Sequence, residues 1–134
     1  MKKLNNKGFT LIEIVIVIVI IAILAAMLVP SLTAWIDNAN KKTFLEAANT
    51  IKTSTLAQLT ENYAVGKKGI DWNAVGETAN CEIGADKDYQ VTLDPAVSDT
   101  AVYGNTLSTF TVENAKYTVT FDNAEGTWGE VTAK

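Results

Sequence analysis

The sequence predicts an α+β fold in which a long N-terminal helix packs, through its second half, on a small antiparallel sheet of about four strands. Three observations support this prediction. Residues 9–29 are almost entirely apolar, residues 32–63 repeat apolar side chains at three- and four-residue steps, and the last third of the chain alternates apolar with polar side chains. The 134 residues leave room for one compact domain beyond the apolar segment.

The apolar segment from Phe9 to Val29 has 21 residues, of which only Thr10 and Glu13 are polar. A helix of that length, at about 1.5 Å per residue, spans a hydrocarbon core of about 30 Å. The residues before it carry three lysines and no acid, which predicts that the N-terminus stays in the cytoplasm and that the chain after Pro30 lies outside. The segment is too long for a secretory signal peptide, and no small-residue cleavage site follows it.

Glu13 is the one charged residue within this segment. A carboxylate at the centre of a membrane helix costs about 2.5–3.5 kcal/mol on insertion scales, and less near an interface. Acids in such positions usually mark function, so we expect the Glu13 carboxylate to have a partner.

Residues 8–13, which read GFTLIE, follow a short lysine-bearing leader and begin an apolar run that ends at Pro30. This pattern closely resembles the class III signal of type IV pilins and pseudopilins. In that family a prepilin peptidase cuts after the glycine and methylates the new N-terminus, which implies cleavage between Gly8 and Phe9. The resemblance covers roughly the first 60 residues. It implies a cleaved basic leader at 1–8, a transmembrane and assembly helix at 9–30 and a globular pilin domain at 31–134.

The resemblance implies a structural subunit of a type IV pilus, which serves adhesion, twitching motility or surface colonisation. The absence of special chemistry and the compact single domain favour a major pilin over a minor one. The precursor would sit in the cytoplasmic membrane and later form an extracellular helical homo-oligomer, with the assembly platform and its ATPase as partners. Glu13 would pair with the Phe9 amine of a neighbouring subunit, and the helix near Pro30 would extend locally in the filament. Two alternatives stay open: a pseudopilin of a type II secretion or DNA-uptake machine, and an unprocessed membrane-anchored binding module.

After Pro30 the apolar residues predict one amphipathic helix that continues to about residue 63. Ser31 could cap a fresh helix, but a proline can also be carried inside a longer helix. The resemblance favours one continuous helix. The apolar stripe that we expect to face the domain consists of Leu32, Trp35, Ile36, Ala39, Phe44, Ala47, Ala48, Ile51, Leu56, Leu59 and Tyr63.

Gly66 and Gly69 are expected to end the helix, and a polar connection follows, with a helical turn after Asp71 as its N-cap. Alternating stretches then predict strands at 89–93, 107–112, 117–121 and 127–132, joined as an antiparallel meander. One face of this sheet should cover the helix. The expected core residues of the sheet are Phe110, Val112, Tyr117, Val119 and Phe121.

The composition argues against catalysis and against direct nucleic-acid binding. There is no His or Arg, and without the three leader lysines 8 lysines face 15 acidic residues. The lone Cys81 has no basic partner and cannot form an intrachain disulfide. We therefore expect no enzyme activity and no cofactor. A calcium site is the one alternative considered, but its spacing matches no loop motif, so solvated acids are the favoured interpretation of Asp86, Asp88, Asp94 and Asp99.

Overall fold

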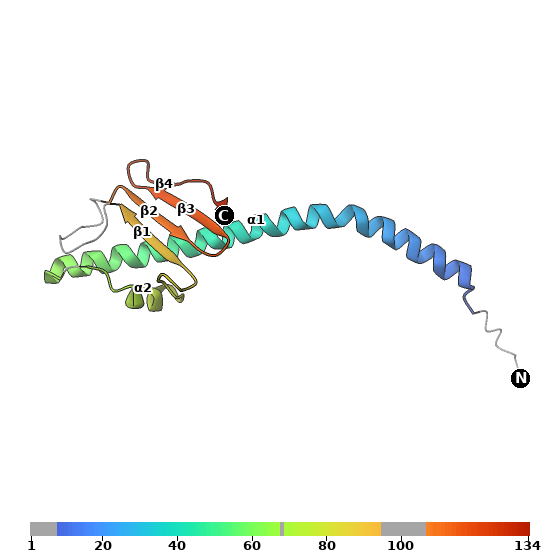
Figure 1. Ribbon diagram of the computed structural model, residues 1–134, viewed down its shortest axis with the longest axis horizontal. Helices are drawn as coiled ribbons and strands as arrows, with labels where there is room; N and C mark the ends of the chain where they lie inside the picture. Colours follow the sequence, from blue (N-terminus) through green and yellow to red (C-terminus); the bar gives the residue numbers. More distant parts are fainter. Residues whose placement is uncertain (1–7, 68, 95–106) are drawn as a thin grey trace, which may run out of the picture. The chain divides into compact units, whose positions relative to one another are not determined.

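The computed structural model describes residues 8–67, 69–94 and 107–134. Within these residues two helices precede five strands. Figure 1 labels both helices and the first four strands. Contacts divide the chain after Ala39 into two compact units. The α+β prediction is confirmed. The elements are α1 (Leu11–Val65), α2 (Trp72–Ala79), β1 (Gln90–Asp94), β2 (Thr109–Glu113), β3 (Tyr117–Asp122), β4 (Thr127–Trp128) and β5 (Thr132–Ala133).

Helix α1 is continuous through Pro30 and ends two residues beyond the expected position. Its end has the geometry of a Schellman motif. The Lys67 amide donates to the Asn62 carbonyl at 2.8 Å and the Gly66 amide donates to the Tyr63 carbonyl at 3.3 Å. Gly66 has a φ of 70°, in the left-handed region where glycine carries no Cβ penalty.

Helix α2 begins where the sequence predicted a helical turn and is longer than that turn. The Asp71 carboxylate accepts hydrogen bonds from the amides of Asn73 and Ala74, at 3.0 and 3.4 Å. The side chain of Gln58 on α1 fixes this start, because it accepts from the Asp71 amide at 2.8 Å and donates to the Asp71 carbonyl at 3.2 Å. At the other end Asn80 adopts the left-handed conformation, with φ 54°.

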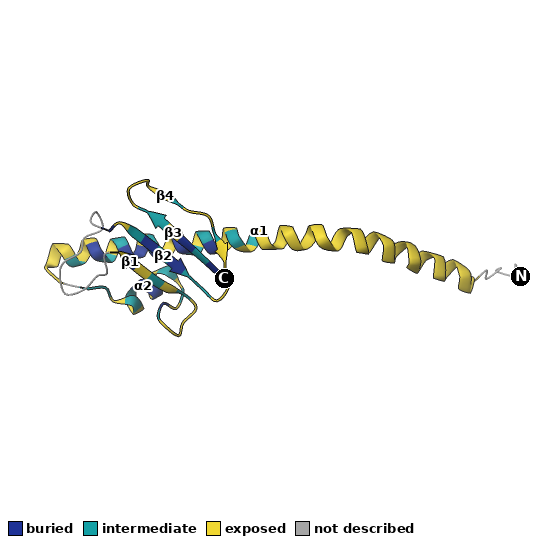
Figure 2. Ribbon diagram, turned by 45° about the horizontal axis from the view of Figure 1, so that its top comes forward, coloured by how far each residue is buried: buried dark blue, intermediate teal, exposed yellow. Residues whose placement is uncertain are grey.

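The strands β1 to β4 form the predicted antiparallel meander, which lies along the second half of α1 (Figure 1). On the inner face Leu93 pairs with Phe110, and Phe110 pairs with Phe121. On the outer face the hydroxyls of Thr111 and Thr120 lie 2.9 Å apart. Figure 2 shows the buried residues of the sheet and of the second half of α1 in dark blue. The core comprises Phe44, Ala48, Ile51, Leu59, Val75, Ile83, Leu93, Leu107, Phe110, Val112, Tyr117 and Val119.

Four of the five expected sheet residues are in this core, and Phe121 is half-buried. Phe121 lies where the sheet meets Lys52 of α1, whose ammonium is 3.3 Å from the centre of the Phe121 ring. The neighbouring Trp128 indole donates to the Asn49 side chain at 2.6 Å. Partial burial lowers the pKa of the Lys52 ammonium. The Lys52 ammonium and the rings of Phe121 and Trp128 therefore cover this side of the core.

The prediction of one strand at 127–132 is wrong in detail, because two short strands, β4 and β5, both pair with β3. Trp128 pairs with Phe121 and Thr132 pairs with Thr118, so three residues of the last segment oppose two of β3. This extra residue is a β-bulge, which shifts the alternation by one position. As a result both Trp128 and Val131 pack against the core.

The expected single stripe on α1 is also wrong at both of its ends. Phe44, Ala48, Ile51 and Leu59 are buried, whereas the N-terminal members of the stripe and Tyr63 are exposed. The step from Ala39 to Phe44 is five residues, or about 1.4 helical turns, so the apolar positions before and after it do not form one row. The exposed N-terminal members are Leu32, Trp35 and Ile36.

Gly76 in α2 provides a test of how closely the chain packs against the end of this helix. A Cβ at Gly76 would lie 2.6 Å from the Cys81 carbonyl oxygen, because the chain folds back over the end of the helix. We expect Gly76→Ala to lower the free energy of unfolding by about 1–3 kcal/mol, as overpacking does elsewhere. Urea unfolding of the full chain in detergent, followed by tryptophan fluorescence, measures this change. The exposed neighbour Glu77→Ala is the control, and equal midpoints for the two variants would contradict the prediction.

Candidate functional site

The expected cleavage position lies in irregular backbone before α1. Gly8, Phe9 and Thr10 have no regular secondary structure and are exposed, with 84% of Phe9 accessible. A Cβ built on Gly8 meets nothing within 4 Å. The Gly8–Phe9 peptide is therefore open to an approaching enzyme and is not locked in a helix.

Glu13 and Thr10 form a capping box at the start of α1. The Glu13 Oε2 atom accepts hydrogen bonds from the Thr10 amide and from the Thr10 hydroxyl, both at 2.7 Å. In return the Thr10 hydroxyl accepts from the Glu13 amide at 3.3 Å. The first helical bond follows, from the Ile14 amide to the Thr10 carbonyl at 3.3 Å. The Glu13 carboxylate therefore stabilises the N-terminal end of α1.

The sequence predicts a partner for Glu13 on another chain, and the contacts of Glu13 with Thr10 of the same chain are not among the predictions. The signal was present, because Thr10 and Glu13 stand three residues apart, immediately before an apolar run, as in a capping box. Within one chain, the capping contacts give the carboxylate two donors in a region otherwise lined by apolar side chains. The pairing of Glu13 with a neighbouring Phe9 amine stays a prediction.

The first part of α1 is long and apolar enough to cross a membrane. Its most apolar window has a mean hydropathy of 3.3, and none of that window is buried within the chain. In Figure 2 this part of the helix is exposed along its length. An apolar helix without cover of its own requires lipid or another protein surface around it.

Pro30 lies inside α1, so the proposal that Ser31 caps a second helix is not needed. The Ser31 hydroxyl instead donates to the Leu28 carbonyl, and the Thr33 hydroxyl donates to the Pro30 carbonyl, each at 2.9 Å. Proline has no amide proton, so the Ala26 carbonyl lacks its usual helical donor. This position is the expected weak point of the helix.

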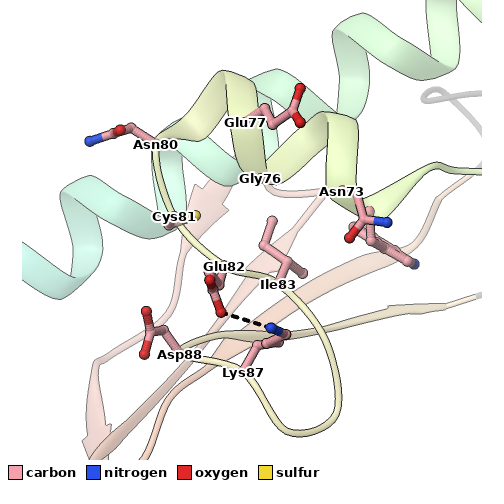
Figure 3. A pocket seen from close by; sticks show the side chains of 10 residues that line it. Asn73, Gly76, Glu77, Asn80, Cys81, Glu82, Ile83, Lys87 and Asp88 are labelled. Carbon is pink, nitrogen blue, oxygen red and sulfur yellow. Dashed lines mark hydrogen bonds and ion pairs between the residues drawn. The ribbon is translucent and has the colours of Figure 1, made fainter.

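A separate polar groove of about 820 Å³ lies between α2 and the segment that leads to β1 (Figure 3). Its wall includes the ion pair between Lys87 and Glu82, at 2.9 Å, together with Cys81 and Asp88. Across residues 8–67, 69–94 and 107–134, no three His, Cys, Asp or Glu side chains are placed to hold a metal ion. Of the acids considered for calcium, Asp99 lies outside the described residues.

The Cys81 thiol is half-buried beside this groove. Desolvation and the negative charge of Asp88 raise its pKa above the ordinary value of 9.0. A raised pKa lowers the thiolate fraction at any pH below it, and the thiolate is the reactive form. The thiol is therefore poorly suited to nucleophilic chemistry.

We expect the native chain to react with iodoacetamide more slowly at pH 8 than the urea-unfolded chain. Asp88→Asn should raise the native rate, because it removes one of the two causes of the raised pKa. Asp86→Asn is the matched control, since Asp86 does not contribute to the shift. The measurement is the alkylation rate as a function of pH. A native midpoint at or below 9.0 would show that the thiol is not perturbed in this way.

Comparison with known proteins identifies the N-terminal segment. Residues 3–29 match the family described as the prokaryotic N-terminal methylation motif. This motif is the class III signal peptide of type IV pilins and pseudopilins. The chain therefore carries the N-terminus of a pilin-like precursor. No curated protein and no solved structure matched the chain.

Proposed function

We propose that this chain is the major pilin of a type IV pilus, processed between Gly8 and Phe9 and polymerised through its apolar N-terminal helix. The observation that carries the proposal is the combination of the methylation motif at residues 3–29 with an apolar helical segment that has no cover within the chain. The role is structural. Membrane anchoring is its first stage, and the filament on the cell surface is its last.

Lipid covers the apolar segment while the precursor is in the membrane, but something else must cover it afterwards. Burial of apolar surface contributes about 25 cal/mol per Å², so a helix of this length cannot stay exposed in water. Other copies of the same chain can supply this cover, because each copy brings one apolar helix. Bundled N-terminal helices would then form the interior of the filament.

The capping box explains how Glu13 could serve both stages. Both hydrogen bonds from Thr10 fall on Oε2, and the described residues place no donor on Oε1. Oε1 can therefore accept from the Phe9 ammonium of a processed neighbour without loss of the cap. A charge-assisted pair at low dielectric is much stronger than in water, and each subunit offers one donor and one acceptor.

Pro30 gives the helix the freedom that packing in a filament requires. The missing Pro30 amide weakens the pattern of helical hydrogen bonds at one turn. This turn lies at the outer end of the apolar segment. We propose that the helix extends locally between about residues 22 and 30 when subunits assemble. An unbroken, regular helix through this segment in a density map of the filament would contradict that part of the proposal.

Mass spectrometry of material sheared from the cell surface tests the proposed function. We expect filaments in which this chain is the dominant protein, with its N-terminus at an N-methylated Phe9. A processed chain that stays with the cell envelope and is absent from sheared filaments would indicate a pseudopilin. A chain that keeps Met1 to Gly8 in the native membrane would indicate an unprocessed membrane-anchored module.

A further inference from the structure

Apolar side chains at the outer end of the membrane segment continue past it as a short exposed row, here called the outer row: Leu28, Leu32, Trp35 and Ile36. Trp35 is 69% accessible and Leu32 is 55% accessible. The steps of four, three and one place these residues on one side of the helix. None of them belongs to the core of the domain that follows. An exposed apolar row of this kind marks a contact with something outside the chain.

We propose that the outer row rests on the outer leaflet of the membrane, with Trp35 anchored among the lipid headgroups, and that this contact fixes the depth of the helix in the bilayer. The proposal rests on membrane anchoring and not on filament formation.

The length of helix between Glu13 and Trp35 fits this placement. The helix is continuous over these residues, and 22 residues at 1.5 Å each span about 33 Å. The hydrocarbon core is about 30 Å thick, and the headgroup regions extend it to about 40–45 Å. If Glu13 lies at the cytoplasmic boundary, Trp35 reaches the external headgroups. Indole rings collect at this level because they combine a large apolar body with one polar N–H.

The polar groups near the outer row are compatible with contact to lipid. The Ser31 and Thr33 hydroxyls donate to carbonyls of their own helix, so they need no water. The first acid after the membrane segment is Asp37, directly after Ile36. The transition from apolar to charged residues therefore falls one or two residues beyond Trp35. A second copy of the chain is the competing occupant, but the row continues the lipid-facing segment without a break.

Quenching by brominated lipid tests the proposal. The full precursor is reconstituted into phosphatidylcholine vesicles at high lipid excess, with bromine at carbons 6 and 7 or at carbons 11 and 12 of one acyl chain. We expect part of the tryptophan fluorescence to be quenched, and more strongly by the shallower bromines. Trp35→Phe should remove the quenchable part. Trp72→Phe is the matched control and should keep it, because Trp72 opens α2 in the outer domain.

Two results would overturn the proposal. Equal quenching in Trp35→Phe and the unmodified precursor would show that Trp35 is not at the lipid. A blue-shifted Trp35 contribution that bromine does not quench, and that fades as the lipid excess increases, would assign the row to a second copy of the chain. Neither result bears on filament assembly, because the vesicles contain only the precursor.

Discussion

Cells whose only copy of this chain carries Glu13→Val are expected to produce no filaments, although the precursor is made, inserted and cleaved. Removal of the acid leaves the Phe9 ammonium of each neighbour without its partner. Breaking one half of a buried ion pair typically costs about 3–5 kcal/mol, which is more than about 100-fold in the equilibrium constant of each contact. The penalty recurs at every subunit. Electron microscopy and immunoblots of the sheared fraction measure the loss.

Glu13→Gln separates the two roles of this side chain. Glutamine can also accept from an N-cap threonine, so the capping box with Thr10 is kept while the charge is lost. We expect Glu13→Gln to assemble almost as poorly as Glu13→Val. Normal filaments from Glu13→Gln would show that the acid acts only as a cap.

Co-expression with the unmodified chain gives a second control for Glu13→Val. The variant still offers its own Phe9 amine to an intact Glu13, so it should enter mixed filaments better than it assembles alone. Filament numbers equal to those of the unmodified chain, from Glu13→Val alone, would remove the ion-pair mechanism.

Gly8→Val is expected to leave the protein in the membrane as a precursor, with a loss of mature product close to complete. The resemblance to pilins implies that the peptidase requires glycine at this position. The substitution should not disturb the chain itself, since a Cβ at Gly8 meets nothing within 4 Å. An immunoblot that resolves precursor from mature protein measures the effect.

Gly8→Ala extends this test with the smallest possible side chain. An intermediate block by Gly8→Ala would indicate that the peptidase excludes side chains by size. Mature protein at normal levels from Gly8→Val would mean that the chain is cut elsewhere. The membrane fraction should contain equal total protein for all variants, because the charges of the leader and the whole apolar segment are unchanged.

The sheet was predictable because each central strand has one buried and one solvated face, which produces a period of two along the sequence. Residues such as Val112 and Val119 follow directly from that period. The split of the last strand was not predictable, because a bulge depends on pairing with β3 and leaves only a weak trace, such as Gly129, in the sequence. Periodicity reports local alternation and does not report which partner a strand finds.

The expected apolar stripe on α1 shows a second limit of predictions from periodicity. Residues such as Trp35 and Phe44 both satisfy a rule of three- and four-residue steps, yet only Phe44 is buried. The rule counts steps but does not follow the phase across the five-residue gap after Ala39. At the candidate site the sequence predicted Gly8, Phe9 and Glu13, and their roles in cleavage and assembly stay predictions. The contacts with Thr10 were not predicted, because the resemblance implies a partner for Glu13 outside the chain.

The contacts around α2 bear on the order in which the outer domain folds. Gln58 reaches Asp71, 13 residues away, and Asn62 donates to the Gly69 carbonyl, 7 residues away. Trp128 must reach Asn49 across 79 residues. Short loops close with a smaller entropy loss, so the turn from α1 into α2 can form early in synthesis. The bond between Trp128 and Asn49 has to wait for almost the entire chain, and until then the inner face of α1 lacks part of its cover.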